Sequence, residues 1–316
     1  MKRQWWVIVF LGVITCLAWL GSIHPILELI PNARSQIFVF TFLVFISFVL
    51  VKQIRPSIFA VVILLIHGMY LTPYVFANPD PLENNSIEIK AMQYNIYYNN
   101  KNIEAVADEI INSNSDVVAI HELLPEVWVN LKQRLEKEYP HSYAVPFDKD
   151  SGGQSSGGMA FLAKESLIPI KVDISYSPPD RVLLAAKTEV DGQTVTLVGL
   201  HPHASRFETR KVELRENQLD GVVKLAEETD GPILVLADMN VTPTSPTYQN
   251  FINELGWRDP HRSTGWNTTW PTWGSAFGFP IDHIFASDHF LIHKAETNSG
   301  SGSDHRSLVV DLSIPS

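Results

Sequence analysis

Three long stretches without Asp, Glu, Lys or Arg lie within the first 77 residues, and they restrict what this part of the chain can form. They cover residues 5–23, 36–51 and 57–77. A helix of about 20 apolar residues can cross the hydrocarbon core of a bilayer, whereas a signal peptide or a buried core helix accounts for only one such stretch. Three in succession, joined by short polar connections, predict three transmembrane helices.

Basic residues around these stretches predict their orientation. Lys2 and Arg3 precede the first stretch, and Lys52 and Arg55 lie between the second and the third. The other connection, residues 24–35, holds one basic and one acidic residue. Loops rich in Lys and Arg stay on the cytoplasmic side. We therefore expect an integral membrane protein whose N-terminus is cytoplasmic and whose chain after residue 77 lies outside the cytoplasm.

The chain changes character after Asn-Pro-Asp-Pro at residues 78–81, because proline ends the preceding helix. We expect a membrane anchor at residues 1–80 and a second domain at residues 81–316. Five of 24 basic residues and one of 34 acidic residues precede position 78, which leaves 19 and 33 and a formal net charge of −14. An acidic domain repels polyanions, so avid nucleic-acid binding without sequence preference is not expected.

Strand and helix patterns interleave along the second domain, and Asp191-Gly192 predicts a hairpin turn. Interleaved elements with hairpin-linked strands favour an α+β layered sandwich over a purely parallel sheet. Residues 152–158 are rich in Gly and Ser and are expected to form a loop. The predicted strands cover residues 87–95, 117–120, 159–162, 182–189, 194–200, 233–237, 281–286 and 307–312, and the predicted helices cover 102–111, 125–139, 208–228 and 245–255.

Polar side chains capable of chemistry lie at the ends of six of these strands. Each has another interpretation when taken singly, because an Asp or Asn there is often a turn or helix cap. Strands of one layered fold often end at a shared face, so the six sites are expected to converge. They are Asn95, His121 with Glu122, His201 with His203, Asp238 with Asn240, Asp282 with His283, and Asp304 with His305.

In this order the sites resemble the motifs of the endonuclease/exonuclease/phosphatase superfamily, which has the deoxyribonuclease I fold. The resemblance covers residues 89–312. It implies a four-layer α/β/β/α sandwich, here preceded by three transmembrane helices, as in a bacterial subset located in the inner or plasma membrane. The motifs are Gln93-Tyr94-Asn95, His121-Glu122 (usually Gln-Glu), the strand ending in His201, Ala237-Asp238-Met239-Asn240 (usually Gly-Asp-Phe/Leu-Asn), Ile281-Asp282-His283-Ile284 and Ser303-Asp304-His305.

The resemblance also implies a role for each residue. Glu122 is expected to be the principal metal ligand, with Asn95 beside it and Asp304 as a further candidate. The expected ion is Mg²⁺, with Mn²⁺ or Ca²⁺ as alternatives, because such cations prefer carboxylate and amide oxygens. The implied catalytic residues are Asp238 to activate or orient water, Asn240 to hold a phosphate oxygen, His305 to contact the scissile phosphate with Asp282 or Asp304 in support, and His201 to donate to a non-bridging oxygen.

This combination of residues suits the hydrolysis of a phosphate ester. Attack of water on phosphorus builds negative charge, which a cation and imidazole or amide donors stabilise, and a base takes the proton of the water. In one departure from the family, residues 96–100 hold no carboxylate where several relatives have one. A single, weakly held cation is therefore expected. His203 is the alternative donor to His201.

The sequence leaves open the roles of two further groups of residues. Trp266, Trp270 and Trp273 either pack in the core beneath the site or line a substrate pocket. Arg206 and Arg210 either bind phosphate or begin a solvated helix.

The main hypothesis is a metal-dependent hydrolase of phosphodiester or phosphomonoester bonds outside the cytoplasm. Its substrate is a phospholipid, a small phosphodiester or a nucleic acid, and the bilayer is its other partner. Tethering and acidic charge favour a lipid or a small phosphorylated substrate. One alternative is a nuclease on the same side of the membrane. Another is a non-catalytic membrane-tethered binding module, which the intact set of site residues disfavours.

Overall fold

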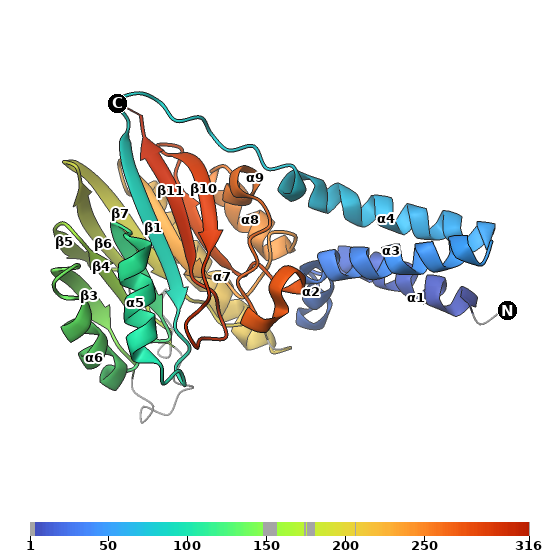
Figure 1. Cartoon of the computed structure of the whole chain (residues 1–316), viewed down its shortest axis with the longest axis horizontal. Coiled ribbons are helices and arrows are strands. Elements are labelled where there is room, and N and C mark those ends of the chain that lie inside the picture. Colours follow the sequence, from blue (N-terminus) through green and yellow to red (C-terminus); the bar gives the residue numbers. More distant parts are fainter. Residues whose placement is uncertain (1–3, 148–156, 174, 176–180, 206, 316) are drawn as a thin grey trace.

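The computed structural model describes residues 4–147, 157–173, 175, 181–205 and 207–315, so most of the expected loop at 152–158 lies outside the described residues. A group of long helices projects from the domain that holds the strands (Figure 1). The described helices include α1 (Gln4–Leu17), α2 (Pro25–Asn32), α3 (Arg34–Leu50), α4 (Ile54–Val75), α5 (Ile103–Ser113), α6 (Pro125–Leu135), α7 (Thr209–Glu227), α8 (Pro246–Leu255) and α9 (Pro260–Thr264), with 3₁₀ turns η1 (Ala18–Leu20) and η4 (Thr272–Phe277). The strands are β1 (Ile87–Asn95), β2 (Val117–His121), β3 (His141–Val145), β4 (Met159–Ala163), β5 (Leu167–Ile170), β6 (Leu183–Val190), β7 (Gln193–Leu200), β8 (Ile233–Asp238), β9 (Asp282–Ala286), β10 (Leu291–Thr297) and β11 (Leu308–Ile314).

The strands form two sheets, which confirms the expected mixed α+β class. One sheet has the order β10-β11-β1-β2-β4-β3 and the other β5-β6-β7-β8-β9. β1 pairs with β2, and β7 with β8, in parallel, while the remaining neighbours are antiparallel. The hairpin predicted at Asp191-Gly192 joins β6 to β7. Parallel and antiparallel pairs coexist because helices join some strands and tight turns join others.

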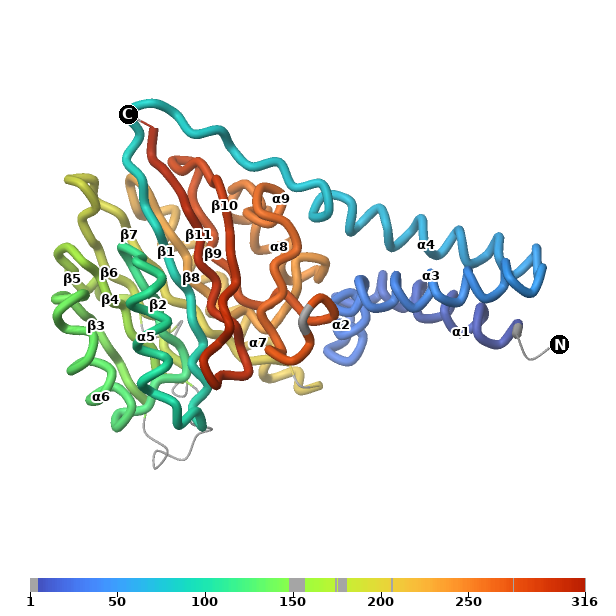
Figure 2. Tube along the Cα trace, in the orientation of Figure 1, coloured from blue at the N-terminus to red at the C-terminus, as the bar shows by residue number. Residues whose placement is uncertain are grey.

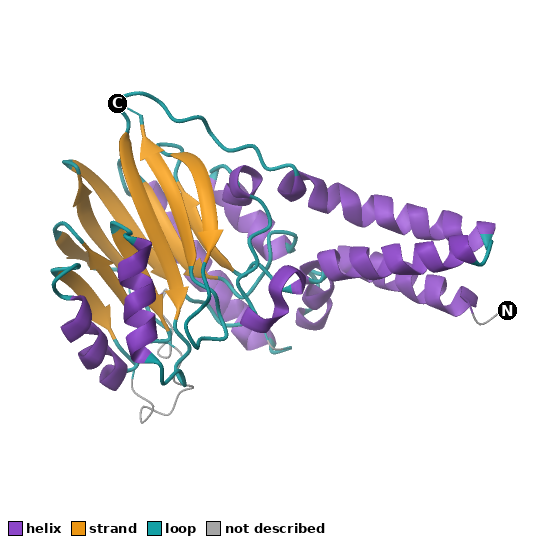
Figure 3. Ribbon diagram, viewed as in Figure 1, coloured by secondary structure: helices purple, strands orange, loops and turns teal. Residues whose placement is uncertain are grey.

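The two sheets pack face to face, and helices cover their outer faces (Figure 3). Alternation along β1 shows how the sequence builds this arrangement, since successive side chains of a strand point to opposite faces. Ile89 and Ala91 lie in the core between the sheets, whereas Met92 and Tyr94 lie in the core beneath α5 and α6. A third core joins the other sheet to α7 and α8.

The helices α1, α3 and α4 run side by side away from the domain (Figure 2). By length and composition, α4 is the one described helix able to span a membrane alone, and α1 with η1 and α2 forms a second candidate bent by 114°. α3 is apolar but has 17 residues. Many of the apolar side chains on these helices are exposed, among them Phe40 and Leu43.

The expectation of a polar loop at residues 24–35 is wrong in one respect, because most of these residues form α2. His24 caps this helix by accepting a hydrogen bond from the backbone N–H of Ile26 at 3.2 Å. Pro25 occupies the first helical position, where its missing N–H costs nothing, and Glu28 lies in the first turn. These start signals were hidden by the apolar stretches on either side.

Buried polar contacts attach the long helices to the domain. Arg215 of α7 lies 2.8 Å from Glu28 of α2, and both side chains are almost fully buried. The Asn32 side chain accepts a hydrogen bond from the backbone N–H of Thr242 at 2.7 Å. Tyr74 of α4 donates to Asp259 at 3.1 Å. The α2 contacts therefore reach the loop that leaves β8, just after Asp238.

Candidate active site

The polar residues at the strand ends gather at one end of the two sheets. Asn95 and His121 are register partners at the ends of β1 and β2, and Asp238 lies opposite Asp282 where β8 ends and β9 begins. Asn95 joins the two sheets, because its Nδ2 donates to Asp238 Oδ2 at 2.9 Å. His305 lies just before β11, which runs antiparallel to β1 and therefore starts at the same end.

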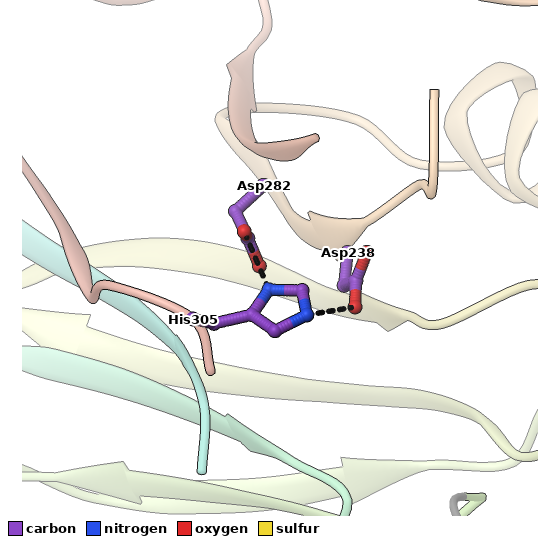
Figure 4. Close-up of side chains that lie close together, drawn as sticks. All are labelled: Asp238, Asp282 and His305. Atoms are coloured by element: carbon purple, nitrogen blue, oxygen red, sulfur yellow. Dashed lines mark hydrogen bonds and ion pairs between the residues drawn. The ribbon is translucent and has the colours of Figure 1, made fainter. Parts of the chain in front are cut away.

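His305 is held between two carboxylates (Figure 4). Its Nδ1 lies 2.8 Å from Asp282 Oδ2 and its Nε2 lies 3.8 Å from Asp238 Oδ2. Burial by itself lowers the pKa of His305, but the charges of Asp282 and Asp238 outweigh burial and raise that pKa to about 10. The imidazole is therefore protonated at neutral pH, with its Nε2–H directed toward Asp238.

Backbone and hydroxyl groups fix His305 and Asp282 in place. The Thr269 hydroxyl accepts hydrogen bonds from the backbone N–H groups of Ile281 and Asp282, both at 3.2 Å. Ser303 donates to the carbonyl of Asn95 at 2.7 Å and accepts from the backbone N–H of His305 at 3.0 Å. The end of β1, the start of β9 and the loop before β11 are thus held in register by side chains.

Asp238 lies at the centre of the group and is 1% exposed. Burial, and then the neighbouring charge of Asp282, raise its pKa to about 7, although His305 and Asn95 oppose the shift. The backbone N–H of Asn240 donates to Asp238 Oδ1 at 3.1 Å. A carboxylate with such a pKa can accept a proton near neutral pH.

His201 follows β7 and reaches the same carboxylate, with Nε2 3.4 Å from Asp238 Oδ2. Burial, and then the charge of Arg181, hold the pKa of His201 well below its usual value, so the ring is neutral and its contact with Asp238 is no ion pair. Arg181 Nη1 lies 2.8 Å from the ring nitrogens of His201. The ring of His121 packs edge-on against His201, with centroids 5.6 Å apart. His203 is buried nearby in the loop.

Arg181 is the functional candidate that the sequence motifs missed. It lies outside every family motif in the sequence, two residues before the largely buried strand β6. Its signal in the sequence was an arginine immediately followed by a run of apolar residues. An arginine at the start of a buried strand is itself drawn into the interior, where its guanidinium needs polar partners. Of the two arginines proposed from the sequence, Arg210 is exposed at the start of α7, and Arg206 lies outside the described residues.

Glu122 lies on the other side of Asn95, in a backbone conformation with a φ of 61°. The backbone N–H of Tyr98 donates to Glu122 Oε2 at 3.1 Å. Burial raises the pKa of Glu122, because the charged form is poorly solvated there. A bound cation would remove this penalty.

The residues present fit a divalent cation. Glu122 and Asn95 offer the carboxylate and amide oxygens that a hard cation prefers, and Asp282 Oδ1 is buried without a hydrogen-bond partner. Donor atoms of Asp238, Asp282 and His305 also lie within 4.8 Å of one another. In this group, His305 Nδ1 and Asp282 Oδ2 already contact each other at 2.8 Å. We therefore regard Glu122 and Asn95 as the better candidate ligands.

The remaining predicted residues lie at the rim. Asn240 donates through Nδ2 to the carbonyl of Pro202 at 3.3 Å, which places it beside the His201 loop. Asp304 Oδ2 accepts a hydrogen bond from Trp270 Nε1 at 3.1 Å. Trp266 packs against Tyr74 of α4, with ring centroids 5.8 Å apart, and Trp273 is largely exposed. The three tryptophans therefore divide between the rim, the helix contact and the surface.

The sequence matches the Endonuclease/Exonuclease/phosphatase family over residues 92–305, which is about two thirds of the chain. The chain belongs to this family. Endonuclease/Exonuclease/phosphatase enzymes are metal-dependent hydrolases of phosphoric esters, and this chain is accordingly such an enzyme. The match begins after the N-terminal helices and does not bear on them. A comparison with curated proteins gave no match.

Solved structures of this family share the fold. An endonuclease/exonuclease/phosphatase from Bacteroides vulgatus is 20% identical with a TM-score of 0.58, and covers 72% of this chain and 99% of its own. Humanized D. rerio TDP2 is 18% identical with a TM-score of 0.53, covering 72% and 99%. A variant of beta toxin from Staphylococcus aureus with bound magnesium ions is 19% identical with a TM-score of 0.53, covering 72% and 100%.

Proposed function

We propose that this enzyme is a membrane-anchored, Mg²⁺-dependent hydrolase of phosphodiester or phosphomonoester bonds that works outside the cytoplasm. Residues 1–80 form an anchor of three transmembrane helices, and residues 81–316 form the catalytic domain. One observation carries the proposal: His305 lies 2.8 Å from Asp282 and 3.8 Å from Asp238.

The proton-handling groups suit attack by water. Asp238 takes a proton from the water molecule while the oxygen of that water bonds to phosphorus. The ester P–O bond then breaks, and the departing oxygen takes up a proton from solvent. His305 donates from Nε2 to a phosphate oxygen, and Asp282 holds its ring. Glu122 and Asn95 would hold Mg²⁺, which would supply positive charge to neutralise the phosphate.

Three further residues orient the phosphate in this proposal. Neutral His201 donates from a ring N–H to a non-bridging oxygen, and Arg181 fixes its ring while adding positive charge. Asn240 binds another oxygen after giving up its contact with the Pro202 carbonyl. Asp304 acts from the rim, where its second carboxylate oxygen is the candidate for a further metal contact.

The arrangement of the long helices supports the proposed orientation. The catalytic domain adjoins the end of α1, the start of α3 and the end of α4, whereas the turn between α3 and α4 lies at the opposite end with the N-terminus (Figure 1). That turn and the α4 start carry Lys52 and Arg55, which favour the cytoplasmic side. The formal net charge of −14 after residue 77 favours a phospholipid or small phosphorylated substrate over bulk DNA.

The test uses the full chain in detergent micelles, because buried contacts join α2 to the domain. Hydrolysis of phospholipid, of a chromogenic bis-phosphodiester and of plasmid DNA is measured with Mg²⁺, beside Asp238→Asn and His305→Ala. We expect loss of hydrolysis in both variants and higher rates on phospholipid or the small diester than on DNA. Preference for plasmid would identify a nuclease, and equal rates in the variants would remove the mechanism. No hydrolysis and no Mg²⁺ binding would identify a binding module.

A further inference from the structure

An uncharged aromatic segment connects the rim of the active site to the long helices. Residues 263–281 contain no Asp, Glu, Lys, Arg or His, although the chain after residue 77 has 19 basic and 33 acidic residues. The segment includes three Trp and two Phe residues. Its 3₁₀ turn η4 leaves Trp273 86% exposed and Phe277 64% exposed. Large aromatic side chains rarely stay exposed on a soluble surface without a partner.

This segment follows the boundary between the domain and the helices. At one end, the backbone N–H of Asn78, just after α4, donates to the carbonyl of Arg262 at 2.8 Å. At the other end, Gln36 in the first turn of α3 donates through Nε2 to the carbonyl of Phe277 at 2.9 Å. After Gln36, α3 continues to Leu50 without a charged residue. The exposed aromatic turn is therefore continuous with the apolar surface of α3.

A second exposed apolar surface adjoins the same helix end. α2 directs Glu28 toward the domain, where it is buried against Arg215. Its Ile26 and Leu29 side chains, and Ile23 before it, are instead exposed. A helix with one polar face held by protein and an apolar face left open is suited to the interfacial layer of a bilayer. α2 and η4 thus both present apolar groups where α3 begins.

The same segment also frames the catalytic residues. Thr269 accepts hydrogen bonds from the backbone of Asp282, and Trp270 donates to Asp304, the neighbour of His305. The backbone N–H of Thr272, the first residue of η4, donates to the carbonyl of Asp304 at 2.9 Å. Only a few residues therefore separate the site rim from the exposed aromatic turn.

We infer that η4 enters the headgroup layer of the bilayer through Trp273 and Phe277, and that this contact holds the active-site rim at the depth of phospholipid phosphates. Trp favours the membrane–water interface because its ring is apolar and its N–H is polar. An uncharged contact also avoids the repulsion between an acidic domain and anionic lipids. The inference rests on the proposed anchoring, and it names the phosphate of a membrane lipid as the ester delivered to the site.

The test measures membrane depth by spin labels in the full chain, reconstituted in phosphatidylcholine nanodiscs. Cys16, the one cysteine of the chain, is replaced by Ala, and a nitroxide is attached to Trp273→Cys. Leu43→Cys in the middle of α3 reports the bilayer core, and Ile168→Cys on β5, which is 63% exposed, reports water. Relaxation by oxygen marks lipid, and relaxation by a polar nickel chelate marks water.

We expect the ratio of oxygen to nickel relaxation at position 273 to lie between the values at 43 and 168. A value at 273 equal to that at 168, with position 43 in lipid, would overturn the inference while leaving the anchoring intact. Water exposure at position 43 would instead overturn the anchoring itself. The two failures are therefore distinguishable without any measurement of activity.

A rate comparison tests the link to substrate. Trp273→Ala combined with Phe277→Ala is expected to lower the ratio of the rate on nanodisc phospholipid to the rate on a soluble chromogenic diester. An unchanged ratio would refute delivery through this turn. Absence of hydrolysis of both substrates by the unmodified enzyme would refute the proposed function, and the spin-label depth would still decide the position of η4.

Discussion

The His305 imidazole has one carboxylate on each side. The two contacts differ in length, which indicates different roles for the two carboxylates. Asp282 lies at hydrogen-bond distance, 2.8 Å, whereas Asp238 lies at 3.8 Å and leaves space for another group to share the Nε2–H. Asp282 also has its backbone held by Thr269. We interpret Asp282 as the residue that orients the ring and Asp238 as the one that handles the proton of water.

Asp282→Asn tests this interpretation. The amide keeps the size of the side chain but removes the negative charge that keeps His305 protonated, so we expect kcat to fall by about 10²–10⁴-fold, the usual contribution of a positioned acid or base. The control is Asp311→Asn, a half-exposed carboxylate of β11 that pairs with Lys90 at 3.4 Å. A kcat for Asp282→Asn equal to that of the control would contradict the role.

Metal removal tests the role of Glu122. Chelation is expected to abolish hydrolysis, and added Mg²⁺ is expected to restore it. Glu122→Gln keeps the shape but removes the negative charge expected to hold the cation, so the Mg²⁺ concentration for half-maximal rate should rise by at least about 10-fold, since even an outer partner of a ligand contributes about 10–100-fold. Glu126→Gln, an exposed position on α6, is the matched control. A Mg²⁺ dependence unchanged by Glu122→Gln would exclude Glu122 as ligand.

Most residues of the candidate site were proposed from the sequence because each follows or opens a strand, and strand ends are readable from short apolar runs. Asp238 after residues 233–237 is one example. Arg181 escaped because its importance depends on a contact 20 positions away, with His201. The Asn95–Asp238 hydrogen bond escaped for the same reason, since it joins two different sheets. Such contacts depend on how the sheets pack, which no local pattern encodes.

At the scale of elements, α2 joins the N-terminal helices to the domain through the ion pair of Glu28 and Arg215. Arg215 also donates to Thr247 at 3.0 Å, and Thr247 donates to Glu28 at 2.7 Å. All three side chains are buried, and Arg215 also lies 3.0 Å from the half-exposed Glu216. Removal of Glu28 therefore takes away the buried carboxylate partner of Arg215 and leaves only the half-exposed one, and loss of a buried partner is the costly case.

Glu28→Ala is therefore expected to destabilise the full chain in detergent by about 3 kcal/mol, the lower end of the usual cost of breaking a buried ion pair, because Glu216 still contacts Arg215. Glu28→Leu combined with Arg215→Met replaces the pair by apolar groups and should recover most of that loss. Thermal unfolding followed by circular dichroism measures both. Equal destabilisation by the single and the double variant would show that the pair contributes shape and not charge.

Most strands and covering helices were readable because their periods of two and 3.6 residues are distinct, but β3, β5 and β10 were not among the predicted strands. The alternation along β1 divides its residues between two cores, with Ile89 and Ala91 in one and Met92 and Tyr94 in the other. α2 was missed because its capping signals lie between two apolar stretches that resemble membrane spans. The bend of 114° between α1 with η1 and α2 has no sequence signal beyond residues 21–24, and the contact of Glu28 with Arg215, 187 positions away, is invisible to any local pattern.

At the scale of the whole molecule, the proposed orientation can be tested by reporter fusions. A reporter that is active only outside the cytoplasm should function when fused after Ser316, and should be silent when inserted between α3 and α4, near Lys52. The physical reason is that Lys and Arg close to a span resist transfer across the membrane. A reversed pattern of activity would place the catalytic domain in the cytoplasm and would contradict the proposed localisation.

The pairing of β1 with β11 has a consequence for biosynthesis. Ile87 lies opposite Ile314, so the first and last strands of the domain are neighbours inside one sheet, with β10 beyond them. The ribosome makes this chain from its N-terminus, so β1 is made long before β11, its neighbour in the sheet, and His305 is made just before β11. A nascent chain that has not yet reached these residues lacks both a strand of this sheet and one imidazole of the candidate site.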